Sequence, residues 1–115
     1  MPRSRRLAAF LMLLSGLTHV SQLAVYGTRD HVIGAAIFGF IYFAIGALLL
    51  GRFHLALWLG AILPAIGAVG GIHRFASIHA NPFSIFHVAI DLIVVPICVY
   101  WLIRARHFPF VSSSL

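Results

Sequence analysis

The stretch FSIFHVAIDLIVVPICVYWLIR, residues 83–104, decides the fold because it reads as a membrane span that carries a histidine and an aspartate in its interior. About 20 apolar residues in a helix cross the roughly 30 Å of hydrocarbon in a bilayer. His87 and Asp91 are four residues apart, and side chains at that spacing share one face of a helix. Because an unpaired polar group facing lipid is costly, the stretch predicts a helix whose polar face is turned into a bundle.

The composition of the whole chain agrees with a membrane protein. Of its 115 residues, 62% are hydrophobic and 9% are charged, whereas about a quarter are charged in a typical soluble domain. Apolar runs occupy residues 7–26, 32–50, 55–71 and 84–103, and the joints between them are short. We therefore expect an all-α membrane protein in which residues 1–115 form one antiparallel bundle of four transmembrane helices with short loops.

The arginines predict the orientation of this bundle, because basic residues of short loops are retained on the cytoplasmic side. If the N-terminus is inside, most of the arginines are inside as well, namely Arg3, Arg5, Arg6, Arg52, Arg104 and Arg106, against Arg29 and Arg74 outside. We expect an integral protein of a prokaryotic inner membrane with both termini cytoplasmic. Its expected partners are the lipid bilayer and either further copies of the chain or a larger membrane complex. Nucleic acid is not expected, because the arginines are divided between termini and loops.

A second polar stripe lies in the first predicted span. Four polar side chains fall within about 60° of one another on a helix there, while the other faces are apolar: Ser15, His19, Gln22 and Tyr26. His19 and Asp91 also lie at a similar depth, roughly 10 Å below the outer ends of their spans. We expect the two stripes to face each other, with Asp91 in reach of His19 or Gln22. The second and third spans are expected to be scaffolding.

Histidine and aspartate in this arrangement indicate a metal site or a proton relay near the outer face. Imidazole suits Zn, Cu, Ni and Fe, and a carboxylate can complete the coordination or orient a ligating histidine. The predicted ligands are His19, His87, Asp91 and, as the fourth, His73. Further polar residues could surround them, namely Ser15, Gln22, Tyr26, His31 and His79. The same histidine and aspartate pair could instead exchange protons in a transport protein.

Other interpretations stay open at this point. His19 and His87 could be the two axial ligands of a haem b, since they are on different helices at similar depth. The chain could also be a small accessory subunit of a larger respiratory, photosynthetic or transport complex. Asp91 could be a structural clip, because one or two hydrogen bonds between helices would offset its burial. An enzyme is not expected, because no nucleophile or carboxylate pair is placed for catalysis.

Overall fold

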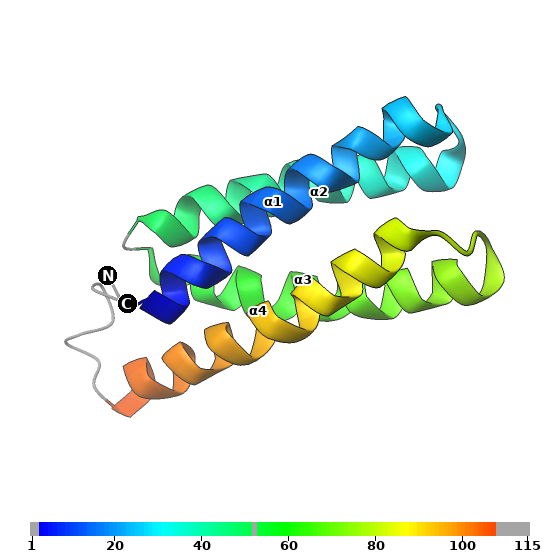
Figure 1. Ribbon diagram of the computed structural model, residues 1–115. Helices are drawn as coiled ribbons and strands as arrows, with labels where there is room; N and C mark the ends of the chain where they lie inside the picture. Colours follow the sequence, from blue (N-terminus) through cyan, green and yellow to red (C-terminus); the bar gives the residue numbers. More distant parts are fainter. Residues whose placement is uncertain (1–2, 52, 108–115) are drawn as a thin grey trace.

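The computed structural model describes residues 3–51 and 53–107 and shows four helices (Figure 1). They are α1 (Arg3–Tyr26), α2 (Asp30–Leu50), α3 (His54–Ser77) and α4 (Pro82–His107). Each is long and apolar enough to cross a membrane. The prediction of four spans is therefore confirmed, with one large difference in a boundary. α3 ends at Ser77 instead of residue 71, so Arg74 belongs to the helix and not to the outer loop where the sequence pattern placed it.

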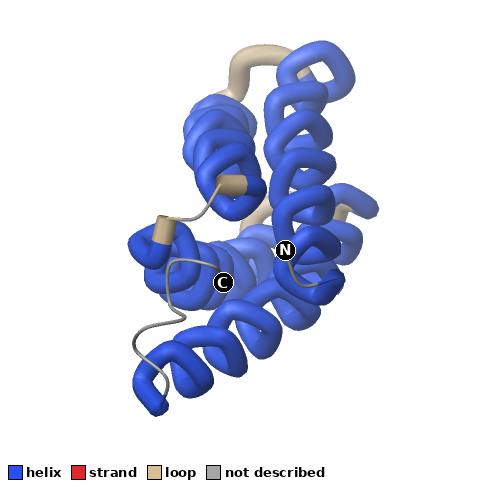
Figure 2. The backbone as a smooth tube through the Cα atoms, turned by 90° about the vertical axis from the view of Figure 1, so that its left-hand side faces the viewer, coloured by secondary structure: helices blue, strands red, loops and turns tan. Residues whose placement is uncertain are grey.

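The helices are arranged as two closely packed pairs. α1 packs along α2, and α3 packs along α4 (Figure 1). The connections at residues 27–29 and 78–81 lie at one end of the molecule, which we call the loop end. The beginning of α1 and the end of α4 lie at the opposite end, which we call the terminal end. Figure 2 shows the same helices from the terminal end, with only short connections between them.

Local sequence signals set two helix boundaries at the loop end. α1 is followed by Gly27, whose positive φ of 80° is a conformation that favours glycine. α4 begins with Pro82, which is well suited to the first turn of a helix because it has no amide hydrogen to leave unpaired. The Asn81 side chain accepts a hydrogen bond of 2.9 Å from the Ser84 amide and so caps this helix.

Glycines explain why α1 and α2 approach so closely. A Cβ atom on Gly16 would lie 2.7 Å from the Gly39 carbonyl oxygen, and one on Gly46 would lie 2.9 Å from the Ala9 carbonyl oxygen. Only glycine fits at such positions, and small residues commonly allow close helix packing in membranes. In α3, Gly60 and Gly71 similarly face side chains of α4. At the glycines of α1 and α2 the helix backbones approach each other directly, without large side chains between them.

The core of the terminal end is apolar and contains one buried charge. Arg5 is fully buried and donates hydrogen bonds to three carbonyl oxygens, at 2.9 Å to Leu49, 3.1 Å to Gly51 and 3.0 Å to Phe53. These carbonyls belong to the end of α2 and the joint after it, where helix carbonyls have no intrahelical partner and the helix dipole is negative. Arg5 therefore fastens α1 to the end of α2.

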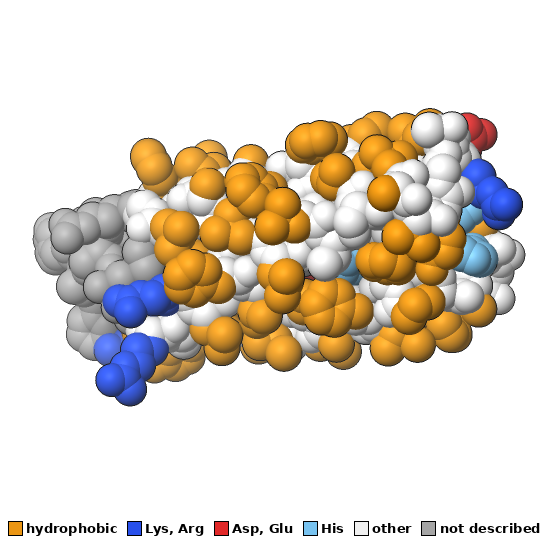
Figure 3. All heavy atoms as spheres, turned by 45° about the horizontal axis from the view of Figure 1, so that its top comes forward, with side chains coloured by type: hydrophobic (Ala, Val, Ile, Leu, Met, Phe, Trp, Pro, Cys, Tyr) orange, Lys and Arg blue, Asp and Glu red, His pale blue; other side chains and the backbone are white. Residues whose placement is uncertain are grey.

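The outer surface is compatible with lipid. Large hydrophobic side chains are widely exposed on the helices, among them Phe40, Val69 and Leu92, each about two-thirds exposed or more. Figure 3 shows such side chains over the middle of one face, with arginine and aspartate side chains toward its ends. In water this surface would be unstable, whereas in a bilayer it matches the hydrocarbon region.

Candidate functional site

Polar side chains are buried in the half of the molecule nearer the loop end. Ser15 and Gln22 of α1 are fully buried, and His87 and Asp91 of α4 are at most 4% exposed. The two stripes expected from the sequence therefore do lie inside the bundle. Arg74 of α3 is also buried, at 9% exposure, although the sequence pattern did not mark it as a site residue.

His19 and His87 form the centre of this polar region. Their rings stack with centroids 3.5 Å apart and planes 9° from parallel. His19 donates a 2.7 Å hydrogen bond from Nδ1 to the Ser15 carbonyl oxygen, and His87 Nε2 is hydrogen-bonded to the Thr18 hydroxyl, also at 2.7 Å. The two rings are in direct contact here, whereas the axial histidines of a haem lie on opposite faces of its macrocycle. The bond of His19 Nδ1 lies within α1, and the bond of His87 Nε2 joins α4 to α1.

The partner of Asp91 differs from the one that the sequence predicted. The group that interacts with the Asp91 carboxyl is the Tyr42 hydroxyl of α2 and not His19 or Gln22. That hydroxyl also lies 3.4 Å from the Leu63 carbonyl oxygen. The other carboxyl oxygen, Oδ1, is buried and has no hydrogen-bond partner.

Tyr42 reaches α4 because of the glycines around it. α1 and α2 approach closely enough for the edge of the Tyr42 ring to contact His19, with ring centroids 5.2 Å apart. On the other side, Gly67 of α3 leaves the space that the hydroxyl occupies. α2 is therefore part of the site and not only scaffolding. The available signal was that Tyr42 is the one polar side chain within an otherwise apolar run.

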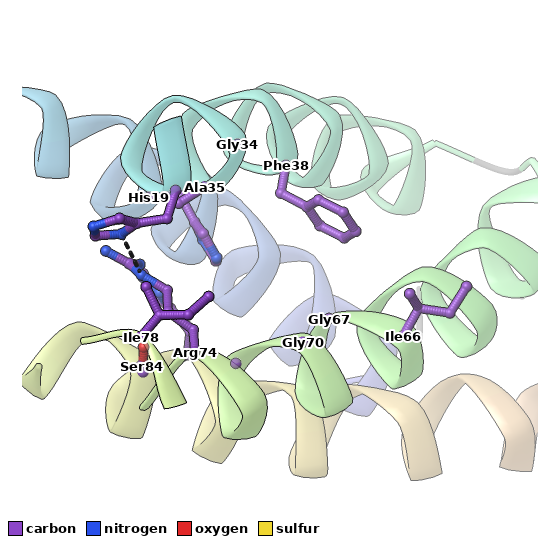
Figure 4. Close-up of a pocket in the computed structure, with 13 residues that line it drawn as sticks. His19, Gly34, Ala35, Phe38, Ile66, Gly67, Gly70, Arg74, Ile78 and Ser84 are labelled. Atoms are coloured by element: carbon purple, nitrogen blue, oxygen red, sulfur yellow. Dashed lines mark hydrogen bonds between the residues drawn. The ribbon is translucent and has the colours of Figure 1, made fainter. Parts of the chain in front are cut away.

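Arg74 is the buried residue that the sequence analysis missed. Its guanidinium donates from Nε to His31 Nδ1 at 3.0 Å and from Nη1 to the Gln22 side-chain oxygen at 2.6 Å, while Nη2 is buried without a partner. Figure 4 shows it extending from α3 across the gap towards α1 and α2. A signal was present, because Arg74 follows Gly67 and Gly71 at intervals of seven and three residues, which places all three on one helix face.

The histidines near the loop end differ in their surroundings. His79 packs against Tyr26 and His31, with ring centroids 4.8 Å and 5.6 Å apart, so these predicted neighbours gather at the loop end. His73, expected as the fourth metal ligand, is exposed on α3. Within residues 3–51 and 53–107, no group of three histidine, cysteine, aspartate or glutamate side chains is placed to hold a metal ion.

A cavity of about 270 Å³ opens beside this region, between α2 and α3 (Figure 4). Its polar lining comes from all four helices and consists of His19, His31, Arg74, Ser84 and His87. The stacked histidines and Arg74 thus border a space large enough for a small molecule or water.

No known protein family, no curated protein and no solved structure matches this chain. Its function is therefore inferred from the site's own residues.

Proposed function

We propose that the chain is a small polytopic membrane protein that binds and releases protons at a buried site during transport. The observation that carries this proposal is a chain of four ionisable side chains in contact inside the bundle, namely His87, His19, Tyr42 and Asp91. Ionisable groups are rare within membranes, and those that pair with one another commonly mark proton relays or substrate pathways. Such a chain offers adjacent places for a proton to reside.

The site's contacts favour proton exchange over metal binding. Parallel imidazole rings do not direct their lone pairs at a common ion, and the His19 and His87 nitrogens described above already have hydrogen-bond partners. Asp91 keeps one oxygen, Oδ1, without a partner, which is the atom to which a proton or a water molecule can be added. The cavity that borders the two histidines offers space for water beside them.

We further propose that the helices cross an inner membrane in antiparallel order with both termini in the cytoplasm, so that the loop end faces outward. The exposed arginines support this orientation, because Arg3, Arg6 and Arg104 lie near the terminal end and Arg29 lies at the loop end. We expect that a reporter that works only in the cytoplasm is active when it is fused after Leu115. Activity only on the outside would contradict the orientation.

Infrared difference spectroscopy tests the proton site directly, because Asp30 and Asp91 are the chain's only acidic side chains. The protein is placed in liposomes and the external pH is changed. We expect a carboxyl band that changes with pH, is absent in Asp91→Asn and is kept in Asp30→Asn, since Asp30 is exposed at the loop end. A spectrum in which Asp91→Asn and the unmodified protein respond identically would overturn the proposal.

The accessory-subunit hypothesis makes a different prediction in the same experiment. A protein whose role is only to pack against larger subunits needs no group that exchanges protons, so its buried carboxyl band would stay constant as the external pH changes. In that case the contact between Asp91 and Tyr42 would only stabilise the packing of α4 against α2.

A further inference from the structure

Two glycines in the cavity wall have no packing role. A Cβ atom on Gly34 of α2 or on Gly70 of α3 would meet no other atom within 4 Å, whereas one on Gly16, Gly39 or Gly46 would collide with a neighbouring helix. Glycine in the interior of a helix is less favourable than alanine by about 1 kcal/mol. Gly34 and Gly70 lie on opposite walls of the cavity, so their small size keeps it open.

The charge of Arg74, which lines this cavity, is not compensated within the described residues. Arg74 bonds to two neutral side chains, Gln22 and His31, and forms no ion pair with a carboxylate in the described part of the chain. Its Nη2 atom is buried without a partner. A buried cation is costly unless an opposite charge and further hydrogen bonds satisfy it. A bound anion beside the guanidinium would supply the opposite charge.

The unpartnered Nη2 atom of Arg74 is not sufficient evidence for an anion site. Arg5 likewise leaves Nη1 unpartnered, but Arg5 is fully buried and does not line the cavity. Arg74 has an unpartnered donor and is also part of the cavity lining. Guanidinium groups bind carboxylate and phosphate oxygens well because their donors match the spacing of the oxygens.

The rest of the lining is apolar and reaches the outer surface. Phe38 extends into the cavity from α2, and Ile66 and Ile78 line it while remaining just over half exposed (Figure 4). The cavity is therefore open between α2 and α3 along a surface that is compatible with lipid. Its volume of about 270 Å³ is slightly below the range of about 300–1,000 Å³ typical of small-molecule pockets.

We propose that this cavity binds an anionic amphiphile, with a carboxylate or phosphate head group at Arg74 and a single apolar chain along Phe38 and Ile66. The ligand enters from the membrane between α2 and α3. This site shares His19 and His87 with the proposed proton site, but ligand binding does not depend on proton exchange at Asp91.

Thermal stabilisation by defined probes tests the proposal, since a ligand that binds only the folded protein raises its melting temperature as the ligand saturates the site. The purified full chain in nanodiscs of zwitterionic lipid is titrated with octyl phosphate and octanoate. Octanol and octylammonium have the same chain with a neutral or positive head group, and inorganic phosphate has the head group alone. We expect saturable stabilisation by the two anionic amphiphiles and little by the other three.

Variants locate the effect. Arg74→Gln should weaken octyl phosphate binding by at least about tenfold, and Gly70→Leu should abolish it by filling the cavity. Val69→Leu, on the exposed side of the same turn, should bind normally. Asp91→Asn should also bind normally, which separates this proposal from the proton site. If Arg74→Gln fails to fold, Gly70→Leu decides alone.

Several results would overturn the proposal. Equal stabilisation by octanol would remove the role of the anionic head group, and equal stabilisation by inorganic phosphate would remove the role of the apolar chain. Normal octyl phosphate binding by Gly70→Leu would show that the probe does not occupy this cavity.

Discussion

The two buried arginines differ in what surrounds them. At the terminal end, Arg5 is held by three backbone carbonyl oxygens within a closely packed apolar core. Towards the loop end, Arg74 is held by two neutral side chains beside a cavity. Backbone carbonyls at a helix end are fixed acceptors that are present in every state of the folded protein. Side chains such as Gln22 and His31 can rotate towards or away from a ligand.

This difference extends to the two halves of the bundle. The terminal half uses its glycines to bring helices into contact and its arginine to join α1 to α2. The loop half contains Gly34 and Gly70, which bring nothing into contact, and an arginine that forms no ion pair with a carboxylate of the described residues. Gly71 of the loop half still packs against α4, but Gly34, Gly70 and Arg74 border open space there.

The largest expected effect compares two glycines of α2, one in each half. Gly46→Leu should destabilise the protein by about 3 kcal/mol or more, because a side chain there would overlap Ala9 and Leu13 of α1. Gly34→Leu should change the stability by less than about 1 kcal/mol, since it projects into open space. Equilibrium unfolding in mixed micelles measures both. Equal losses would show that the two halves are packed alike.

A somewhat smaller effect is expected when the arginines themselves are exchanged for methionine. Arg5→Met leaves up to three carbonyl oxygens without their donor, so the free energy of unfolding should fall by about 2 to 3 kcal/mol. Arg74→Met removes a charge that lacks a counter-ion, and its partners can turn to the water in the cavity. Its loss should stay below about 1 kcal/mol.

The opposite order of stability of the two arginine variants would contradict this prediction. If Arg74→Met is the more destabilising of the two in unfolding measurements, Arg74 has a structural role and the cavity is not held open for a ligand.

Much of the fold could be predicted from the sequence, because length and hydrophobicity determine whether a helix can cross a bilayer. The stripes on α1 and α4 were also predictable, since polar side chains at helical spacing avoid lipid. Arg74 was missed because a hydropathy run ends at the first polar residues. α3 nevertheless continues through His73 and Arg74, and the Arg74 guanidinium is hydrogen-bonded to buried Gln22. Which helix supplies the partner of a buried group depends on packing between helices.

Asp91 illustrates that last point. Asp91 is buried, as its place on the polar face of the helix predicted, but the sequence offered His19 and Gln22 as its partners on α1. The close approach of α1 and α2 through Gly16 and Gly39 brings Tyr42 into the space between the helices. Helical periodicity within one segment carries no information on that approach.

The smallest expected effect is the coupling between Tyr42 and Asp91, measured by a double-mutant cycle with Tyr42→Phe and Asp91→Asn. Hydrogen bonds between membrane helices average about 0.6 kcal/mol in such cycles, so a coupling of about 0.5 to 1 kcal/mol is expected if these two groups are bonded. Asp91→Asn alone should be nearly neutral in stability, because an amide can still accept from the Tyr42 hydroxyl. Tyr42→Phe with Ser84→Ala is the matched control, since Ser84 bonds to Asn81, and its two effects should simply add. A coupling of zero for Tyr42 and Asp91 would mean that Asp91 is held by other groups. It would also remove Tyr42 from the proposed proton site and leave the two histidines and Asp91 without their connection through α2.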